Sequence, residues 1–266
     1  MDVAVPRRAP RLPGVTMAGF RQRVPTPVDI AMVAHPSVTL LVDLSSGDGL
    51  VCTTGDRRER GSVLVGLAPG DLRATGTGGA CLQIRLSPAA AAGALGAPLG
   101  ASGPLCALRD VWGRDAVRFE DRLRAAASWD ERFAITEEVL ARRLGACRPV
   151  DPEVAYTWRR TVTTRGRVRV DGLADEVGWS RKRLWARFGS QLGITPKRAA
   201  RLVRFDHAVH LLAAGQAPAS VAASSGYVDQ SHLHREVKEF AGLTPPAVAV
   251  APWLAIDDVA WPGRAR

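Results

Sequence analysis

The C-terminal half of this chain contains one short pattern twice. The first copy runs from Gly178-Trp179-Ser180 to Gly193-Ile194-Thr195-Pro196, and the second runs from Gly226-Tyr227-Val228-Asp229 to Gly242-Leu243-Thr244-Pro245. From Leu184 onward, each residue of the pattern has its counterpart 49 positions later. A small apolar helix, a glycine-aromatic turn and a helix with a polar first residue are typical of a helix-turn-helix unit. The repeat therefore predicts two DNA readers in one monomer, which would address two successive major grooves.

In the first copy, Asp171 is expected to cap a short apolar helix, and Gly178 supplies the turn because glycine readily adopts positive φ. Ser180 then caps a second helix, whose core side carries Leu184 and Phe188 four residues apart. With that side buried, the residues predicted to contact DNA from this unit are Ser180, Arg181, Lys182 and Trp185.

The second copy repeats this plan, with Gly226 at the turn and Asp229 as the N-cap. Leu233 and Val237 are expected to face the core. Glutamine can read adenine and arginine can read guanine in the major groove. The residues predicted to contact DNA from this unit are Gln230, Ser231, His232 and Arg235.

Between the copies, Thr195-Pro196 is expected to open a long helix over 197–212. This rod would hold the two readers about 34 Å apart, which is one turn of DNA. The chain has 36 Lys+Arg and 26 Asp+Glu, and residues 159–204 hold 13 and 3 of them, which leaves 23 of each sign elsewhere. The whole excess of +10 thus lies on this segment, where we expect Lys197 and Arg201 to contact phosphates. The alternative to DNA binding is that this basic segment is only a solvent-exposed face that binds no partner.

The sequence of the N-terminal half predicts short strands separated by glycine-rich turns. Strands are expected near 15–21, at 38–42, 50–53, 62–66 and 80–86, with a turn at 45–49 and a helix or loop over 87–104. This spacing predicts an antiparallel barrel or sandwich. Amphipathic helices follow at 115–127 and after the capping box Ser128–Glu131. They either pack on the β-rich core or form a dimerisation surface, and the sequence leaves both open.

Asp151-Pro152-Glu153 has the cap, proline and acid of a helix start, and it marks the expected domain boundary. The chain is therefore divided into a β-rich effector or dimerisation domain (1–147), a DNA-binding domain (152–250) and a tail (251–266). No apolar run is long enough for a transmembrane helix, and the N-terminus lacks the apolar stretch of a signal peptide, so a cytoplasmic protein with no membrane contact is expected.

Catalytic chemistry has little support in the sequence. Cys52, Cys81, Cys106 and Cys147 are scattered without metal-binding spacing, which favours reduced structural thiols. His35 is the one histidine of the N-terminal half, whereas a metal site needs a cluster of ligands. We therefore expect no metal, no cofactor and no enzyme activity.

Residues 152–250 resemble the DNA-binding domain of AraC/XylS-type transcription regulators, which consists of two helix-turn-helix units joined by a linker helix. The stretch from Gly226 through Arg235 to Pro245 is similar to the characteristic sequence motif of that family. The family usually has phenylalanine where this chain has Val237, and its frequent arginine in the first unit is replaced by Ala186, beside an outward Trp185. Base contacts from the first unit are therefore less secure than those from the second.

This resemblance implies an α+β chain, with an N-terminal barrel-like (cupin-like) domain and trailing helices before the all-α DNA-binding domain. It implies a sequence-specific regulator that binds double-stranded DNA and responds to a small-molecule effector or to homodimer formation. The alternative is an enzyme, such as a DNA-repair protein, fused to the same type of DNA-binding domain. The sequence does not name the operator, the effector or the direction of regulation.

Overall fold

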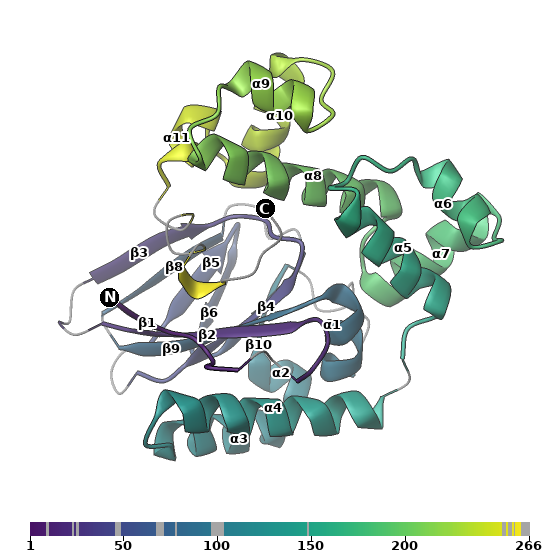
Figure 1. Ribbon diagram of the computed structural model, residues 1–266. Coiled ribbons are helices and arrows are strands. Elements are labelled where there is room, and N and C mark those ends of the chain that lie inside the picture. The colour runs from purple at the N-terminus through teal and green to yellow at the C-terminus, as the bar shows by residue number, and fades with distance from the viewer. Residues whose placement is uncertain are drawn as a thin grey trace.

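The structure, a computed structural model, describes residues 1–8, 11–22, 24, 27–45, 49–67, 72–77, 79–96, 104–147, 149–251, 254, 257 and 259–261. Its first half is built on antiparallel sheets and its second half is helical, which confirms the α+β class (Figure 1). Within the described residues, no helix is both long enough and apolar enough to cross a membrane.

Two antiparallel sheets face each other in the β-rich half. The larger sheet has the order β1-β2-β9-β4-β7-β10, and its strands are β1 (Asp2–Ala4), β2 (Val15–Arg21), β9 (Ala80–Leu86), β4 (Val38–Asp43), β7 (Val63–Val65) and β10 (Leu105–Ala107). The smaller sheet has the order β3-β8-β5-β6, and its strands are β3 (Pro27–Met32), β8 (Leu72–Thr77), β5 (Val51–Thr54) and β6 (Arg57–Arg60). Among the described strands no pairing joins the two sheets, so of the expected barrel or sandwich the β-rich half is an open sandwich.

Strand β9 shows how the sandwich separates its two faces. Successive side chains of a strand point to opposite faces. Leu82, Ile84 and Leu86 are fully buried in the main core, on the side that the helices cover. The alternate residues Gln83 and Arg85 line a cavity between the sheets. The two faces of one central strand therefore serve different purposes, packing on one side and a cavity on the other.

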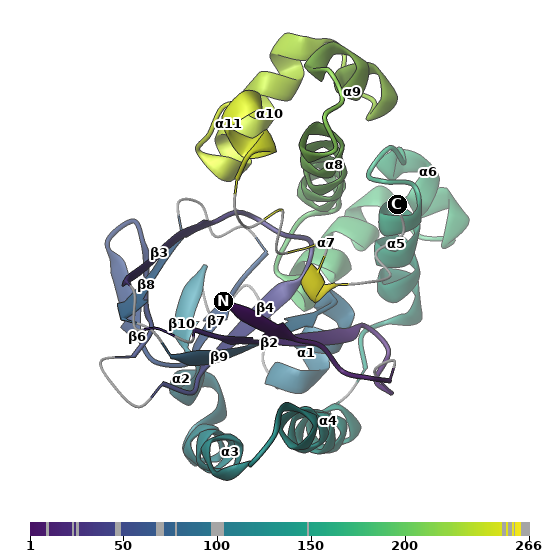
Figure 2. The same ribbon diagram turned by 60° about the vertical axis from the view of Figure 1, so that its left-hand side comes forward.

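Helices cover the outer face of the larger sheet. They are α1 (Pro88–Leu95), α2 (Leu108–Trp112), α3 (Arg114–Ala125) and α4 (Trp129–Ala146) (Figure 2). The expected capping box at the start of α4 is formed in part: Ser128 Oγ accepts from Glu131 N–H, but the Glu131 carboxylate accepts from the N–H of Ala127, the residue before the N-cap. Trp129 lies against Gly19, where an added Cβ would be 2.4 Å from the ring. The apolar faces of α3 and α4 thus pack on the β-rich core through Phe119 and Phe133.

The helical half contains α5 (Pro152–Thr163), α6 (Val170–Glu176), α7 (Arg181–Leu192), α8 (Pro196–Ala213), α9 (Pro218–Ser224), α10 (Gln230–Ala241) and α11 (Pro245–Ala249). Figure 1 shows α6 and α7 near one end of α8 and α9 and α10 near the other. The expected long helix is thus present as α8, one residue longer at each end than predicted. The backbone N–H of Ala34, after β3, donates to Phe240 O at the end of α10, so the two halves meet at the second unit.

Several sequence predictions need correction. The strands β1, β3, β6, β8 and β10 were not expected from the sequence. Asp171 does not cap α6, because the helix begins at Val170 with Arg169 as its N-cap and Asp171 lies within the first turn, where its carboxylate pairs with Arg181 at 2.7 Å. Residues 46–48 of the expected turn and 97–103 of the expected helix or loop lie outside the described residues.

Candidate nucleic-acid interface

The two helix-turn-helix units repeat at the level of single caps. Helices α7 and α10 both have 12 residues and begin 49 positions apart. Ser180 accepts a hydrogen bond from Arg183 N–H and Asp229 accepts one from His232 N–H, so both helices have a side-chain N-cap. Both end at a glycine in the left-handed region, Gly193 with φ of 67° and Gly242 with φ of 68°. The sequence repeat therefore forms two structural units with the same helix length and the same types of cap.

The turns of the two units differ by one residue. Gly178 and Gly226 both have positive φ, but they lie 48 positions apart, whereas the following N-caps lie 49 apart. The extra residue of the second unit is Val228, whose side chain is 87% exposed. This residue projects from the second unit immediately before its second helix.

The exposed side of α10 forms a continuous stripe. The stripe consists of residues at helical spacing, all exposed: Gln230, Ser231, His234, Arg235 and Lys238. The opposite side is buried through Leu233, Val237 and Phe240. Gln230, Ser231 and Arg235 are where the sequence placed them, and the sequence reasoning missed His234 and Lys238. The 3.6-residue period, extended one turn past Arg235, could have found both.

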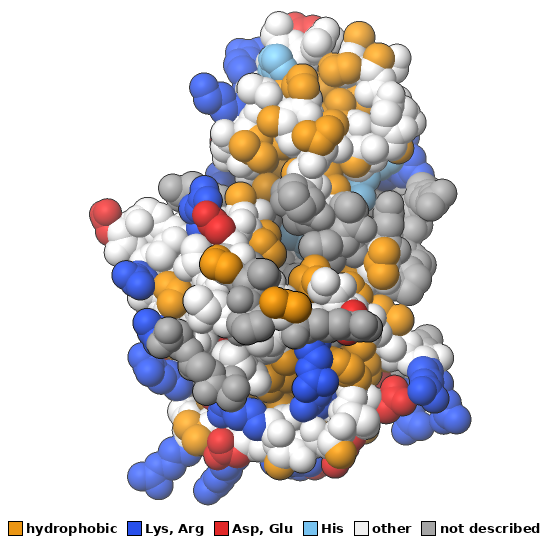
Figure 3. Space-filling model, turned by 90° about the vertical axis from the view of Figure 1, so that its left-hand side faces the viewer, with side chains coloured by type: hydrophobic (Ala, Val, Ile, Leu, Met, Phe, Trp, Pro, Cys, Tyr) orange, Lys and Arg blue, Asp and Glu red, His pale blue; other side chains and the backbone are white. Residues whose placement is uncertain are grey.

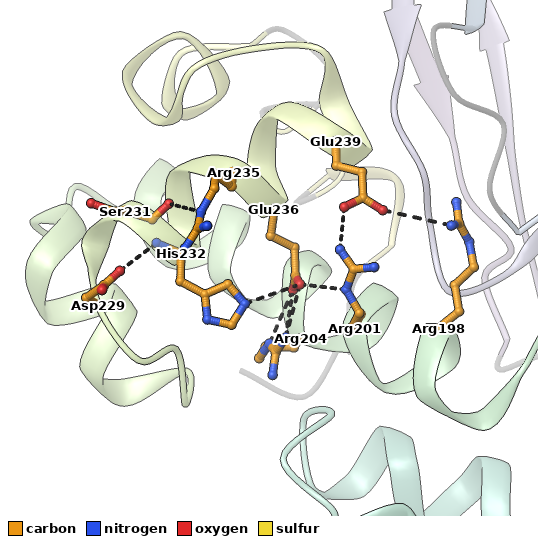
Figure 4. A network of polar contacts seen from close by, with 9 residues as sticks. All are labelled: Arg198, Arg201, Arg204, Asp229, Ser231, His232, Arg235, Glu236 and Glu239. Carbon is orange, nitrogen blue, oxygen red and sulfur yellow. Dashed lines mark hydrogen bonds and ion pairs between the residues drawn. The ribbon is translucent and has the colours of Figure 1, made fainter.

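His232 does not belong to this stripe. Its side chain is only 33% exposed, its ring packs edge-on against Tyr227 at 5.2 Å, and its Nε2 lies 3.9 Å from the Glu236 carboxylate (Figure 4). The ring is therefore turned towards the interior of the unit. His232 stays a sequence prediction as a base contact, but the geometry favours a packing role.

Glu236 connects α10 to the linker helix through a buried ion-pair network. Its side chain is 1% exposed, and it accepts from Arg201 Nε at 2.8 Å and from Arg204 Nη2 at 3.0 Å (Figure 4). Burial of a carboxylate is tolerated when cations and hydrogen bonds satisfy it. Glu239, one helical turn later and 44% exposed, also pairs with Arg201. The network fixes how α10 is rotated about its own axis, and hence which residues its stripe exposes.

Arg201 was expected to contact phosphate, but its guanidinium is held by these two carboxylates and is 29% exposed. The Glu239 hydrogen bond, with smaller contributions from Glu236, raises the pKa of Arg201, although partial burial opposes the shift. A phosphate contact would require Arg201 to leave both partners, so we do not carry it into the proposed interface. Lys197, in the first turn of α8, is exposed.

The corresponding stripe of α7 is less polar. It consists of the residues that lie 49 positions before the α10 stripe: Arg181, Lys182, Trp185, Ala186 and Gly189. Lys182 is exposed and Trp185 is partly buried, whereas the Arg181 guanidinium pairs with Asp171. Ala186 and Gly189 replace the Arg235 and Lys238 of the second unit. The first unit therefore offers fewer donors beyond its first turn.

The loop after α5 holds the units together. Arg165 has a φ of 55° and its Nη1 lies 3.4 Å from His207 on α8. Gly166 follows with a φ of 72°, and an added Cβ would lie 2.1 Å from Ala200 O, so only glycine fits against α8. Arg167 donates to Ser224 O at the end of α9 at 3.3 Å. The first unit thus contacts both the linker helix and the second unit through one turn.

The sandwich interior contains a cavity of about 210 Å³. Phe20, Met32 and Leu41 are among the apolar side chains that line it, and the polar ones include Gln83 and Arg85. Within the described residues, no group of three or more His, Cys, Asp or Glu is placed to hold a metal ion. Burial raises the pKa of the Cys52 thiol to about 12, and the nearby Asp43 carboxylate adds to the shift.

His35 lies near this cavity and links the two halves. Its Nδ1 is 2.6 Å from Ser37 Oγ, and its Nε2 is 3.7 Å from the Asp206 carboxylate on α8. Figure 3 views the face on which the second unit lies above the β-rich half, with hydrophobic side chains towards its middle and many of its Lys and Arg side chains near the edges. The linker helix is therefore in direct polar contact with the β-rich half.

The helical half of the chain is similar to known proteins. Residues 173–249 match the sequence profile of a helix-turn-helix domain. This segment is a helix-turn-helix domain, as the resemblance to AraC/XylS-type regulators led us to expect. The matched segment includes α7, α8 and α10, with their caps and the buried network, and it covers both units that the repeat predicted.

Three relatives illustrate the likeness. An uncharacterized HTH-type transcriptional regulator, YbfI of Bacillus subtilis, is 37% identical over 66 residues, which are 25% of this chain and 24% of that protein. The crystal structure of ToxT from Vibrio cholerae O395 is similar over 89% of this chain and 97% of its own, with 13% identity and a TM-score of 0.49. The C-terminal domain of AraT from Geobacillus stearothermophilus is similar over 38% of this chain and 85% of its own, with 18% identity and a TM-score of 0.36. The match to YbfI spans about a quarter of that relative's length.

Proposed function

We propose that this chain is a sequence-specific, DNA-binding transcription regulator. The observation that carries the proposal is the doubled unit: two capped helices of equal length, each with one side buried and the matching side exposed, joined by one rod. The 18 residues of α8 span about 27 Å at 1.5 Å per residue. A rod of this length suits readers in major grooves one turn, about 34 Å, apart.

The stripe of α10 supplies the base contacts of this proposal. Gln230 suits adenine, and Arg235 suits guanine, because each can make two hydrogen bonds to the major-groove edge of its base. We add His234 and Lys238 from the same stripe. The caps Ser180 and Asp229 already accept backbone hydrogen bonds, so they orient their helices.

The first unit contributes a different mixture. Lys182, Arg181 and the partly buried Trp185 lie on its exposed side, and Lys197 at the start of α8 is placed for a phosphate. Phosphate contacts add affinity for any sequence, whereas base contacts discriminate between sequences. Because Ala186 and Gly189 continue the stripe without side-chain hydrogen-bond donors, we infer that the first unit contributes more phosphate contacts than base contacts.

The β-rich half serves in this proposal as the effector domain, over the division 1–147, 152–250 and 251–266. Three observations support it. The sandwich contains a largely apolar cavity, and Gln22 Oε1 on its wall is buried with no hydrogen-bond partner among the described residues. The β-rich half also touches the second unit through Ala34 and the linker helix through His35. A small molecule in the cavity would thus act on both.

The test is selection of bound fragments from random DNA, followed by mobility shift at physiological salt. The proposal expects an enriched sequence that binds at least 10³-fold more tightly than random DNA, which is the usual lower bound for specific recognition. Equal binding to selected and random DNA at that salt would overturn it.

Two variants separate base reading from phosphate grip. Arg235→Ala should cost about 1–3 kcal/mol at a single base pair and relax the preference there. Lys197→Ala should weaken all sequences alike and make the salt dependence shallower by about one ion. The matched control is Arg109→Ala, which removes an exposed arginine of α2 in the β-rich half. It should leave both properties unchanged.

A further inference from the structure

The C-terminal segment that includes Leu254, Asp257, Ala260 and Trp261 returns to the β-rich half after the last helix. Figures 1 and 2 show its yellow helical piece lying against the sheets, away from α11. Leu254 is 4% exposed and belongs to the main core. Ala260 and Trp261 pack with Ala18 of β2 in a separate apolar cluster, so the segment is anchored at both ends.

Between these anchors, the segment places a carboxylate on the cavity wall. The Asp257 carboxylate lies 2.6 Å from Arg85 Nη2, and the two side chains are 5% and 13% exposed. The Trp261 ring covers the same guanidinium, with Arg85 Cζ 4.2 Å from the ring centroid. Both Arg85 and Asp257 line the cavity between the sheets. A buried arginine on an apolar cavity wall is a strong anion site, because a charge-assisted hydrogen bond gains strength away from water.

We propose that Asp257 and Trp261 act as a built-in plug: the Asp257 carboxylate occupies the anion site of Arg85, and Trp261 covers it. In this proposal, a molecule with an apolar body and a carboxylate binds Arg85 by displacing Asp257 from Nη2. Because the other Asp257 oxygen lies 3.5 Å from His210 Nε2 on α8, displacement also removes a contact between the plug and the linker helix. This last consequence rests on the proposed function, whereas occupation of the cavity does not.

The test uses Asp257→Asn in the full chain, with 4-phenylbutyrate and its neutral amide as probes, measured by calorimetric titration. Asparagine keeps the size of the side chain but removes the charge that holds Arg85. The plug predicts that the variant binds the carboxylate at least tenfold more tightly than the unchanged chain, whereas the amide gains less than threefold. Adding Arg85→Gln to the variant should abolish the preference for the carboxylate.

A matched control is available in the same half of the chain. Asp29 pairs with Arg73 at the same distance of 2.6 Å, but both side chains are more than half exposed. Asp29→Asn should therefore leave carboxylate binding unchanged. Equal affinity of Asp257→Asn and the unchanged chain for 4-phenylbutyrate, or no binding to the variant at millimolar concentration, would overturn the plug.

A second measurement needs no variant and covers the case in which Asp257→Asn misfolds. Backbone hydrogen exchange at Asp257, Ala260 and Trp261 in the unchanged chain should speed up at least tenfold when 4-phenylbutyrate saturates the cavity. The buried strand β4 should exchange at its original rate. Saturation of the cavity without faster exchange of the segment would contradict displacement, and it would do so whether or not the chain binds DNA.

Discussion

Replacing Glu236 by glutamine tests the buried network that sets the rotation of α10. The substitution keeps the shape of the side chain and removes its charge. Arg204 and Arg201, which are 16% and 29% exposed, then face a neutral amide instead of a carboxylate. Arg201 keeps Glu239, but Arg204 loses the carboxylate that accepts the hydrogen bonds of its Nε and Nη2. The damage therefore concentrates on the less exposed arginine.

Breaking a buried pair by removing one partner costs about 3–5 kcal/mol, because an uncompensated charge stays buried. The amide oxygen can still accept one hydrogen bond, and water reaches part of Arg201. We therefore place the loss at the lower end, about 3 kcal/mol. For a chain of this size, that corresponds to a fall in melting temperature on the order of 6–12 °C.

Urea unfolding of the full chain, followed by circular dichroism, measures this loss, and Glu239→Gln is the matched control. Glu239 lies on the same helix and pairs with the same Arg201, but its side chain is 44% exposed. An exposed pair contributes about 0.2–1 kcal/mol. Equal losses in the two variants would show that burial does not make the Glu236 pair special, and the reasoning would fail.

Three further outcomes follow from the structure. Gly166→Ala should destabilise the chain by more than about 2 kcal/mol in urea unfolding, because the added Cβ meets Ala200 O. Gly178 also has positive φ but has open space around it, so Gly178→Ala should cost only about 1–2 kcal/mol. Equal losses of stability in the two variants would contradict the contact with Ala200. Burial, with the nearby Arg165, lowers the pKa of His207, so its contribution to stability is present above its unfolded pKa near 6.5 and is lost as the pH falls below it. His207→Gln should therefore flatten the fall in unfolding free energy between about pH 7.5 and pH 5.5, and an unchanged slope would refute this. Cys52, fully buried with a pKa raised to about 12, should resist iodoacetamide at pH 8 until urea is added, as mass spectrometry of the labelled peptides would show, and rapid labelling of the folded chain would count against its burial.

The sequence predicted the repeat because each of its signals is local. An N-cap such as Ser180 or Asp229 and a terminal glycine such as Gly193 act within one turn of helix, so their spacing carries directly into the structure. The strand β9 was predicted with its correct bounds for a similar reason, since alternating apolar residues of a central strand are recognisable without knowledge of its partners.

The missed strands depend on their partners. Strands β3 and β8 contain Pro27, Asp29 and Gly76, which have low strand propensity, and they pair with each other along six residues. Strand β6 consists of charged residues at the edge of the smaller sheet, where solvent solvates them. Pairing over a long sequence separation, which a local pattern does not contain, determines β3 and β8, whereas β6 pairs with its neighbour β5 but lacks the apolar alternation that marks a strand.

The residues of the candidate interface also fall into those that a local pattern predicts and those that depend on tertiary contacts. The positions of Gln230, Ser231 and Arg235 on the exposed side of α10 follow from helical period alone. The inward turn of His232 and the engagement of Arg201 depend on Glu236, a glutamate that sequence reasoning would place in solvent. Only the approach of α8 to α10 reveals that this carboxylate is buried between two arginines.

The central claim is that one chain reads two successive major grooves, and missing-base interference mapping on a selected DNA fragment tests it most directly. Two recognition helices joined by α8 should give two clusters of required bases on one face of the duplex, with centres about 10–10.5 base pairs apart. Arg235→Ala should erase a required base in one cluster and leave the other intact. A single cluster, or two clusters whose spacing departs from one helical turn, would contradict the account.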